Sequence, residues 1–317
     1  MNIHLNYTVP KFSNIKTYNQ NLFHNNIRSL HTDTVSFSAK KEQNQISRFS
    51  QEAIQVGIEL YNKSKTEPLS LEYIQKELQK EIPIVQVKDI KTLPQYANQT
   101  GLLRMIAYYL PKYNNNGDLH ELGMYLDRDI KTVAQFSSLV HEYTHLQQRY
   151  NDDTHIGAYT IIGEKNINLA RGLNGVSSFV FDHLQANKDE RKFKIAAKLA
   201  NKGKQADKAL AEAYGYKNLE SFKKDIAQYF DKTYPIVLTK VLSNEQNKEF
   251  VPFLANPTKL KNAVKQMCIK HAQLEQEAYE SQYQFIKKVD KHSLTDTNKM
   301  NPVYYKIIAE ALSESMK

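Results

Sequence analysis

Hydrophobic residues change their spacing along this chain, and these changes predict where its helices and strands lie. Before about residue 45 the apolar side chains follow no period among Asn, Ser, Thr and Lys, which predicts a disordered leader over 1–45. Apolar residues then recur at helical spacing over 45–60 and again over 70–80, where Ser70 can cap the second helix. The folded part of the chain is therefore expected to begin with two helices.

Three short apolar runs follow, each bounded by residues that favour turns. They predict strands at 82–87, 102–110 and 119–126, and the letters NNNGD between the last two predict a hairpin connection. After residue 127 the apolar period lengthens to the helical value of about 3.6, which predicts a helix over 132–149. If the strand before this helix lies at an edge of the sheet, it can hold an extended peptide by backbone pairing.

From 156 to 317 the chain is rich in Ala, Lys, Glu, Gln and Leu and is expected to be almost wholly helical. Breaks are expected near glycine or proline at 172–175, 203, 215, 235 and 252–257. We therefore predict an α+β fold that is predominantly helical, with a small β-sheet packed on a central helix. The predicted organisation is a leader over 1–45, a subdomain with the sheet and the central helix over 46–160, and a helical subdomain over 161–317.

The composition narrows the class of protein. The 317 residues can bury a sizeable core, and no apolar run is long enough to predict a membrane span. The N-terminus lacks the apolar stretch of a secretory signal peptide, so we expect the cytoplasm by default, with secretion that needs no such signal left open. The single cysteine, Cys268, rules out an intrachain disulfide and a cysteine-based zinc site, and we expect it to be a small buried side chain.

The formal net charge of +9 implies a general attraction to acidic partners. The densest basic stretch, 188–208, places its lysines between apolar residues, which is typical of the solvated face of an amphipathic helix. Nucleic-acid grooves more often combine basic residues with arginines and aromatic side chains. We therefore expect no nucleic-acid partner.

The helix predicted over 132–149 contains the motif HEYTH, which places His141 and His145 four residues apart. Residues at this spacing lie on one face of a helix, one turn apart, so both imidazoles can reach one ion. Imidazole is a good zinc ligand, and Glu142 can take a proton from a water on the open position of the metal. The motif predicts one Zn²⁺ ion with Glu142 as general base; a surface helix with two histidines one turn apart by chance is the alternative.

Zinc needs a third protein ligand. A third histidine in the pattern HExxHxxGxxH is excluded, because Gln148 and Asn151 stand where the glycine and the histidine would be. Asp152, Asp153 and His155 follow closely and could supply a ligand, although they fit a loop and a helix cap better.

A later segment, HAQLEQEAYESQ over 271–282, provides a better candidate. Together with HEYTHLQQ it resembles the gluzincin superfamily of zinc metallopeptidases, in which a glutamate on a second helix completes the metal site, often in an ExxA context. Glu275 precedes Ala278 by three, so the resemblance implies that Glu275 is the third ligand. Glu277 is a serious rival and Glu280 a weaker one, and a glutamate-rich helix face that only meets solvent is the other interpretation.

The resemblance covers these two segments alone and departs from the superfamily at Tyr279. Several such families place an acidic or amide residue there, which hydrogen-bonds a histidine of the metal helix. Tyr279 could stabilise the oxyanion, although packing is more typical of a tyrosine in a helix. His271 shares the helix face of Glu275 and could contact the ligand or the substrate, but a partly exposed helix position fits it better.

These residues predict a zinc metallopeptidase, either an endopeptidase or a related amide hydrolase, with a peptide or protein substrate. The main alternative is a helical interaction or scaffold protein with a structural or inactive zinc site. A fourth ligand from Asp153 or His155 would favour that alternative, because structural zinc is usually closed by four protein ligands. A basic nucleic-acid-binding protein rests on net charge alone and ranks last.

Overall fold

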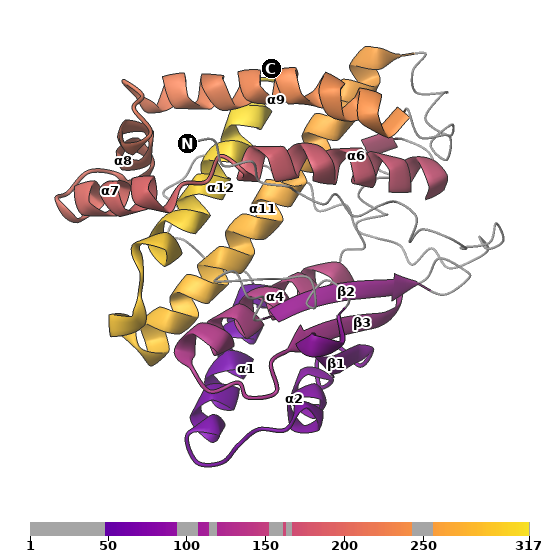
Figure 1. Ribbon diagram of the computed structural model, residues 1–317, viewed down its shortest axis with the longest axis vertical. Helices are drawn as coiled ribbons and strands as arrows, with labels where there is room; N and C mark the ends of the chain where they lie inside the picture. Colours follow the sequence, from indigo (N-terminus) through magenta and orange to yellow (C-terminus); the bar gives the residue numbers. More distant parts are fainter. Residues whose placement is uncertain are drawn as a thin grey trace.

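The computed structural model describes residues 48–93, 107–113, 119–151, 161–162, 167–242 and 256–316 (Figure 1). Helices dominate these residues and a small sheet lies beside the N-terminal helices, so the predicted α+β, predominantly helical class is confirmed. No helix among these residues combines the length and the apolar character that a membrane span needs. The predicted leader over 1–45 and the hairpin residues 114–118 lie outside the described residues.

The N-terminal half consists of helices around a three-stranded sheet. Its elements are α1 (Arg48–Ser64), α2 (Leu71–Leu78), β1 (Val85–Asp89), the short 3-10 helix η2 (Ile90–Thr92), β2 (Ala107–Tyr113), β3 (Leu119–Leu126) and α4 (Val133–Asn151). Ser70 caps α2 as predicted, because its side chain accepts a hydrogen bond from the N–H of Tyr73. β1 begins at Val85 rather than at residue 82, because the N–H of Ile82 still donates to the Leu78 carbonyl after α2. β2 likewise continues past residue 110, to Tyr113.

The strand order is β1-β3-β2, with β1 parallel and β2 antiparallel to β3. β3 has the predicted bounds, but it is the central strand, so the edge position considered for it is not found. The reason lies in its side chains, since residues 122–126 are all buried, as is typical of a strand covered on both faces. The edges of the described sheet are β1 and β2.

α4 begins where predicted because Thr132 and Gln135 form a capping box. The N–H of Gln135 donates to the Thr132 hydroxyl oxygen at 3.2 Å, and the N–H of Thr132 donates to Oε1 of Gln135 at 3.0 Å. After the cap, Phe136, Val140 and Tyr143 form a fully buried stripe. Through this stripe α4 packs against α1, the sheet and a long C-terminal helix, α11 (Pro257–Val289).

The C-terminal half is helical in the described residues. Besides α11 it contains α6 (Ile167–Gln185), α7 (Glu190–Asn201), α8 (Ala206–Ala213), α9 (Leu219–Leu242), the short 3-10 helix η4 (Lys291–Ser293) and α12 (Asp296–Glu314). Gly203 and Gly215, two of the predicted breaks, follow α7 and α8 with φ values of 94° and 90°. This left-handed conformation favours glycine and ends both helices.

Two other predicted breaks are wrong, because 172–175 and Pro235 lie inside α6 and α9. Leu173 and Val176 are buried in α6, and Tyr234 is buried beside the proline in α9. The buried face of each helix therefore continues through the expected break. Core packing outweighs the local preference of glycine and proline at both places.

Two large hydrophobic clusters form the core, and α11 contributes to both. Towards its start, α11 places Val264, Met267 and Cys268 among the C-terminal helices; Cys268 is fully buried, as predicted. Towards its end it places Phe285 and Ile286 in the cluster of α1, α2, α4 and the sheet. α11 therefore fixes the two halves against each other, and its middle crosses α4 (Figure 1).

The close approach of α1 and α4 gives a first prediction. A Cβ at Gly57 would lie 2.2 Å from Cγ2 of Val140, a stiff β-branched side chain in the core. We expect Gly57→Ala to lower the free energy of unfolding by about 1–3 kcal/mol through overpacking. In the control Gly175→Ala the added Cβ meets nothing within 4 Å, and alanine gains up to about 1 kcal/mol over glycine inside a helix. Urea denaturation measures both, and equal stability of the two variants would contradict this packing.

Candidate metal centre

His141, His145 and Glu275 come together where α4 crosses α11. Nε2 of His141 lies 3.7 Å from Oε2 of Glu275, and Nε2 of His145 lies 3.4 Å from its Oε1. One ligand atom from each of the three side chains lies within 4.8 Å of the other two. Ala278, one turn after Glu275, is fully buried, and its small side chain leaves room for the His141 ring beside α11. The helix contact thus brings two imidazoles and one carboxylate to a common point.

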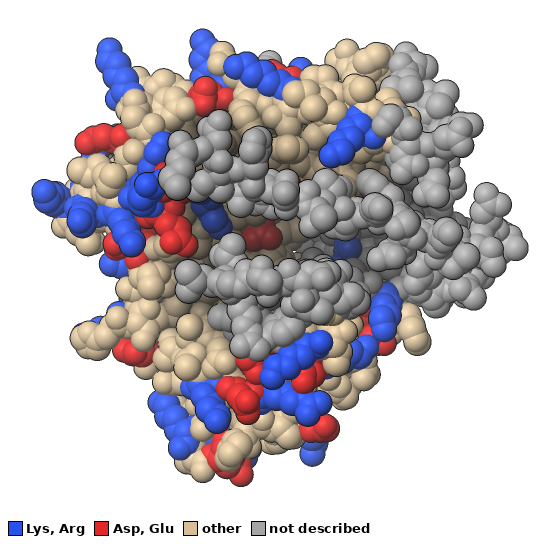
Figure 2. Space-filling view, in the orientation of Figure 1, with Lys and Arg blue, Asp and Glu red and all other residues tan. Residues whose placement is uncertain are grey.

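The cluster is nearly closed but not sealed. The side chains of His141 and His145 are 11% and 8% exposed, whereas that of Glu275 is 25% exposed. Solvent therefore reaches the cluster mainly from the carboxylate side. Figure 2 shows one face of the whole molecule, on which acidic and basic side chains are interspersed.

Neither rival of Glu275 approaches the histidines in this way. Glu277 accepts hydrogen bonds from other side chains, described below, and Glu280 accepts one from Nε2 of Gln284 at 2.7 Å. The described group with metal-ligand geometry contains Glu275 and not these two glutamates. The remaining sequence candidates, Asp152, Asp153 and His155, lie outside the described residues.

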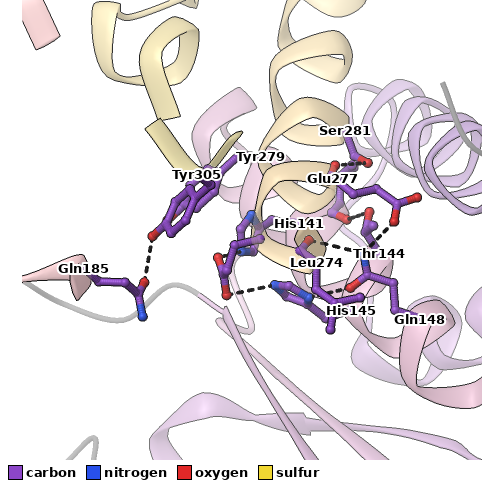
Figure 3. Close-up of polar contacts among 12 residues, drawn as sticks. His141, Thr144, His145, Gln148, Gln185, Leu274, Glu277, Tyr279, Ser281 and Tyr305 are labelled. Carbon is purple, nitrogen blue, oxygen red and sulfur yellow. Dashed lines mark hydrogen bonds and ion pairs between the residues drawn. The ribbon is translucent and has the colours of Figure 1, made fainter. Parts of the chain in front are cut away.

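A chain of hydrogen bonds orients His145 and reaches α1 (Figure 3). Nδ1 of His145 lies 2.8 Å from Oε1 of Gln148. Nε2 of Gln148 donates to Oε2 of Glu277 at 2.9 Å and to the Leu274 carbonyl at 3.2 Å, which fixes the orientation of the amide. The oxygen facing His145 must then accept, so Nδ1 is the donor to Gln148 and Nε2 is the nitrogen that faces the cluster, where a metal ion would displace its proton. Glu277 also accepts from the Ser50 hydroxyl at 3.1 Å, which ties this chain to α1.

His141 is supported differently. The ring of Tyr279 packs edge-on against it, with ring centroids 4.4 Å apart and an angle of 62° between the planes. Nδ1 of His141 is buried and makes no hydrogen bond of standard geometry within the described chain, although the Ala278 carbonyl is close enough to raise the pKa of the ring. Tyr279 therefore contacts His141 through its ring, whereas an acidic or amide side chain at position 279 would hydrogen-bond this histidine.

The charges of the three side chains act on one another. Burial lowers the pKa of His141 to about 3, with a further contribution from the charge of His145. Burial also opposes the charged form of His145, but the carboxylate of Glu275 raises the pKa of His145 to about 9. Burial alone would raise the pKa of Glu275, yet the two histidines and Lys188 lower it to about 2. Glu275 therefore stays ionised at neutral pH and draws positive charge into the space between the three donors.

Glu142 lies beside the cluster. Burial raises its pKa to about 7; the charge of His145 opposes this shift and that of Glu275 adds to it. A carboxyl group with a pKa near 7 both accepts and releases a proton at neutral pH, which general base and acid catalysis requires. The spacing of the motif predicts where Glu142 lies, but this pKa follows from burial in the folded chain.

His271 and Lys188 differ in how well the sequence indicated them. His271 is partly exposed, as predicted, and packs on α6, with Nε2 3.4 Å from the Ser177 hydroxyl and its ring stacked on Phe181. Lys188 had no motif to mark it, since it only opens the basic stretch 188–208. In the folded chain its charge acts on both Glu275 and His141.

The donor set suits zinc. Two imidazole nitrogens and one carboxylate oxygen form the His₂Glu combination of catalytic zinc sites, which leave one position of the metal open. No protein-family model matches the chain, and neither a curated protein nor a solved structure matches it. An activity must therefore be inferred from the side chains at the α4–α11 crossing.

These side chains predict that zinc binds and stabilises the fold. We expect one Zn²⁺ per chain and a higher melting temperature, since a ligand that binds only the folded state stabilises it by about 2.7 kcal/mol at a hundred times its Kd. Glu275→Gln should weaken zinc binding by at least about a hundredfold. This exceeds the usual effect of substituting a residue that only orients a ligand, which is about 10–100-fold. Glu280→Gln, on the same helix, should bind as the unaltered protein does. Calorimetric titration of the metal-free proteins measures the stoichiometry and the zinc affinity of the unaltered protein and both variants, and thermal unfolding measures the melting temperature. Unchanged affinity in Glu275→Gln would exclude Glu275 as a ligand.

The hydrogen-bond chain from His145 yields a separate prediction. Gln148→Met removes the acceptor of the Nδ1 proton, so we expect about ten- to hundredfold weaker zinc binding. Gln147→Met is the matched control, because the neighbouring amide donates to Glu52 instead. Both variants should lose some stability in the metal-free form, and the same titration should show an affinity loss in Gln148→Met alone. Equal affinities would mean that Gln148 only supports the fold.

Proposed function

We propose that this protein is a zinc-dependent metallopeptidase, in which His141, His145 and Glu275 hold one zinc ion and Glu142 is the general base. One observation carries the proposal: a carboxylate that is distant in the sequence lies against both imidazoles of the motif. A glutamate-rich helix face that met only solvent would not place an acidic group there. The substrate class is a peptide or a protein.

The ligand set supports a catalytic rather than a closed site. When bound by three protein ligands, zinc polarises a carbonyl oxygen and lowers the pKa of a water on its open position to about 7. The described group contains three ligands, and the exposed part of Glu275 faces the solvent side of the cluster. A substrate carbonyl can therefore approach from that side.

Glu142 supplies the proton transfer. A pKa of about 7 allows its carboxylate to take a proton from the attacking water and to return that proton to the leaving amine. Glu142 follows His141 directly in α4, so the helix that holds the ligands also positions the base. Proton uptake and release thus depend on the same rigid element as metal binding.

The role of Glu142 can be separated from that of the ligands. We expect Glu142→Gln to retain one zinc per chain and to cleave a mixed peptide library about 10²- to 10⁴-fold more slowly, the usual contribution of a positioned acid or base. Elemental analysis and mass spectrometry of the digest measure the two properties on one sample. Glu280→Gln serves as the control with unchanged cleavage.

Two results would contradict the proposal. Hydrolysis by Glu142→Gln at the unaltered rate would remove Glu142 from the reaction. Zinc binding without cleavage of any peptide by the unaltered protein would favour a structural metal site in a helical interaction protein.

A further inference from the structure

A second polar group lies next to the candidate metal centre, at Lys188. Its Nζ lies 3.4 Å from the hydroxyl oxygens of both Tyr279 and Tyr305, and 4.9 and 5.3 Å from their ring centroids. Burial lowers the pKa of Lys188, while the charges of Glu275 and Glu190 oppose this shift. Within the described residues no carboxylate lies at ion-pair distance from this ammonium.

The position of Lys188 is fixed by the turn between α6 and α7. Its own N–H donates to the Gln185 carbonyl at 2.9 Å. The Tyr214 hydroxyl accepts from the N–H of Asp189 at 3.0 Å and donates to the Asn187 carbonyl at 3.1 Å, which pins the turn on both sides of the lysine. The fold therefore holds the backbone of Lys188 in place, and the two tyrosine hydroxyls position its ammonium.

The two tyrosines connect Lys188 to the metal centre. Tyr279 packs on His141 on one side and stacks on Tyr305 on the other, with ring centroids 5.2 Å apart and an angle of 10° between the planes. Figure 3 shows both rings beside His141, with the Tyr305 hydroxyl donating to Oε1 of Gln185 at 2.7 Å. Tyr279 thus contacts the cation through its hydroxyl and the candidate zinc ligand His141 through its ring.

A largely buried ammonium is costly unless an anion or several acceptors compensate it. An ammonium has three N–H donors, and the described residues offer Lys188 two tyrosine oxygens and no carboxylate partner. The remaining donor and the positive charge are suited to an anion that arrives with the ligand. A carboxylate is the anion that peptides carry.

We propose that Lys188, together with the hydroxyls of Tyr279 and Tyr305, binds a carboxylate of the substrate close to the scissile bond. This inference rests on the proposed peptidase function and names its substrate class, peptides with a C-terminal carboxylate or an acidic side chain near the bond. An oxyanion role fits less well, because an oxyanion donor must lie within hydrogen-bond distance of the reacting carbonyl. Lys188 lies at the hydroxyl of Tyr279, and within the described residues no hydrogen bond or ion pair joins it to His141, His145 or Glu275, which mark that point.

Binding to a protein that does not turn over tests the anion site directly. The zinc-loaded Glu142→Gln protein is titrated calorimetrically with three probes: N-acetyl-Ala-Phe-Leu-Ala with a free carboxylate, its C-terminal amide, and the amide with Glu as last residue. We expect at least one carboxylate probe to bind about ten- to hundredfold more tightly than the neutral amide, the range of a charge-assisted hydrogen bond. The tighter of the two identifies the source of the carboxylate.

Lysine variants in the same background locate the preference. Lys188→Met should abolish it by weakening the carboxylate probe about ten- to hundredfold and leaving the amide unchanged, whereas Lys188→Arg should retain most of it. Lys192→Met is the matched control, because Lys192 lies over the Tyr214 ring at 4.4 Å and is expected to keep the full preference. Zinc content and melting temperature of each variant show that the metal centre and the fold persist.

The possible failures are distinguishable. Equal binding of all three probes to the Glu142→Gln protein overturns the anion site without any variant of Lys188, and so does a preference that survives in Lys188→Met. If Lys188→Met weakens the amide probe as much as the carboxylate probes, the anion site is also overturned, because Lys188 would then contact a group that all the probes share. Cleavage by the unaltered protein is measured separately, so tight carboxylate binding without cleavage supports the anion site and contradicts the peptidase proposal.

Discussion

The crossing of α4 and α11 is the contact on which the rest of the structure depends. It places an ionised carboxylate against two nearly buried imidazoles. Removing a charge from water costs several kcal/mol unless its partners are held at the right distance and orientation. The 33-residue helix α11 fixes this geometry, because one end is packed among the C-terminal helices and the other beside α1 and the sheet. Successive residues of a helix point about 100° apart, so a shift of α11 by one residue would turn Glu275 away from both histidines.

α1 supports this crossing in two ways. Gly57 lets it lie against Val140 of α4, and Ser50 ends the hydrogen-bond chain that orients His145 through Glu277 and Gln148. With the aromatic ring of Tyr279 on the first histidine, the orienting hydrogen bond acts on the second. Residues that orient a metal ligand typically contribute about 10–100-fold to metal affinity, and here that support reaches His145 from α1, through Ser50, Glu277 and Gln148.

The sequence predicted the parts of the site that depend on local periodicity. The apolar period after residue 127 predicted the helix, and the four-residue spacing of His141 and His145 placed both imidazoles on one face of it. Residue spacing alone could not decide between Glu275, which the resemblance favoured, and its rival Glu277, because both belong to one helix and only the packing of α11 decides which carboxylate meets α4. Lys188 was misjudged for a similar reason: it opens a stretch typical of a solvated helix face, yet it precedes α7, in a turn closed by Tyr214.

The separation of Lys188 from Glu275 has its own electrostatic consequence. An ammonium paired directly with Glu275 would neutralise the carboxylate that a zinc ion needs and would compete with the metal for it. Lys188 instead donates to the hydroxyls of Tyr279 and Tyr305, so its charge lowers the pKa of Glu275 without occupying the carboxylate oxygens. The ammonium therefore stays available to an incoming carboxylate, and the proposed anion site acts electrostatically on the metal centre without taking a ligand from it.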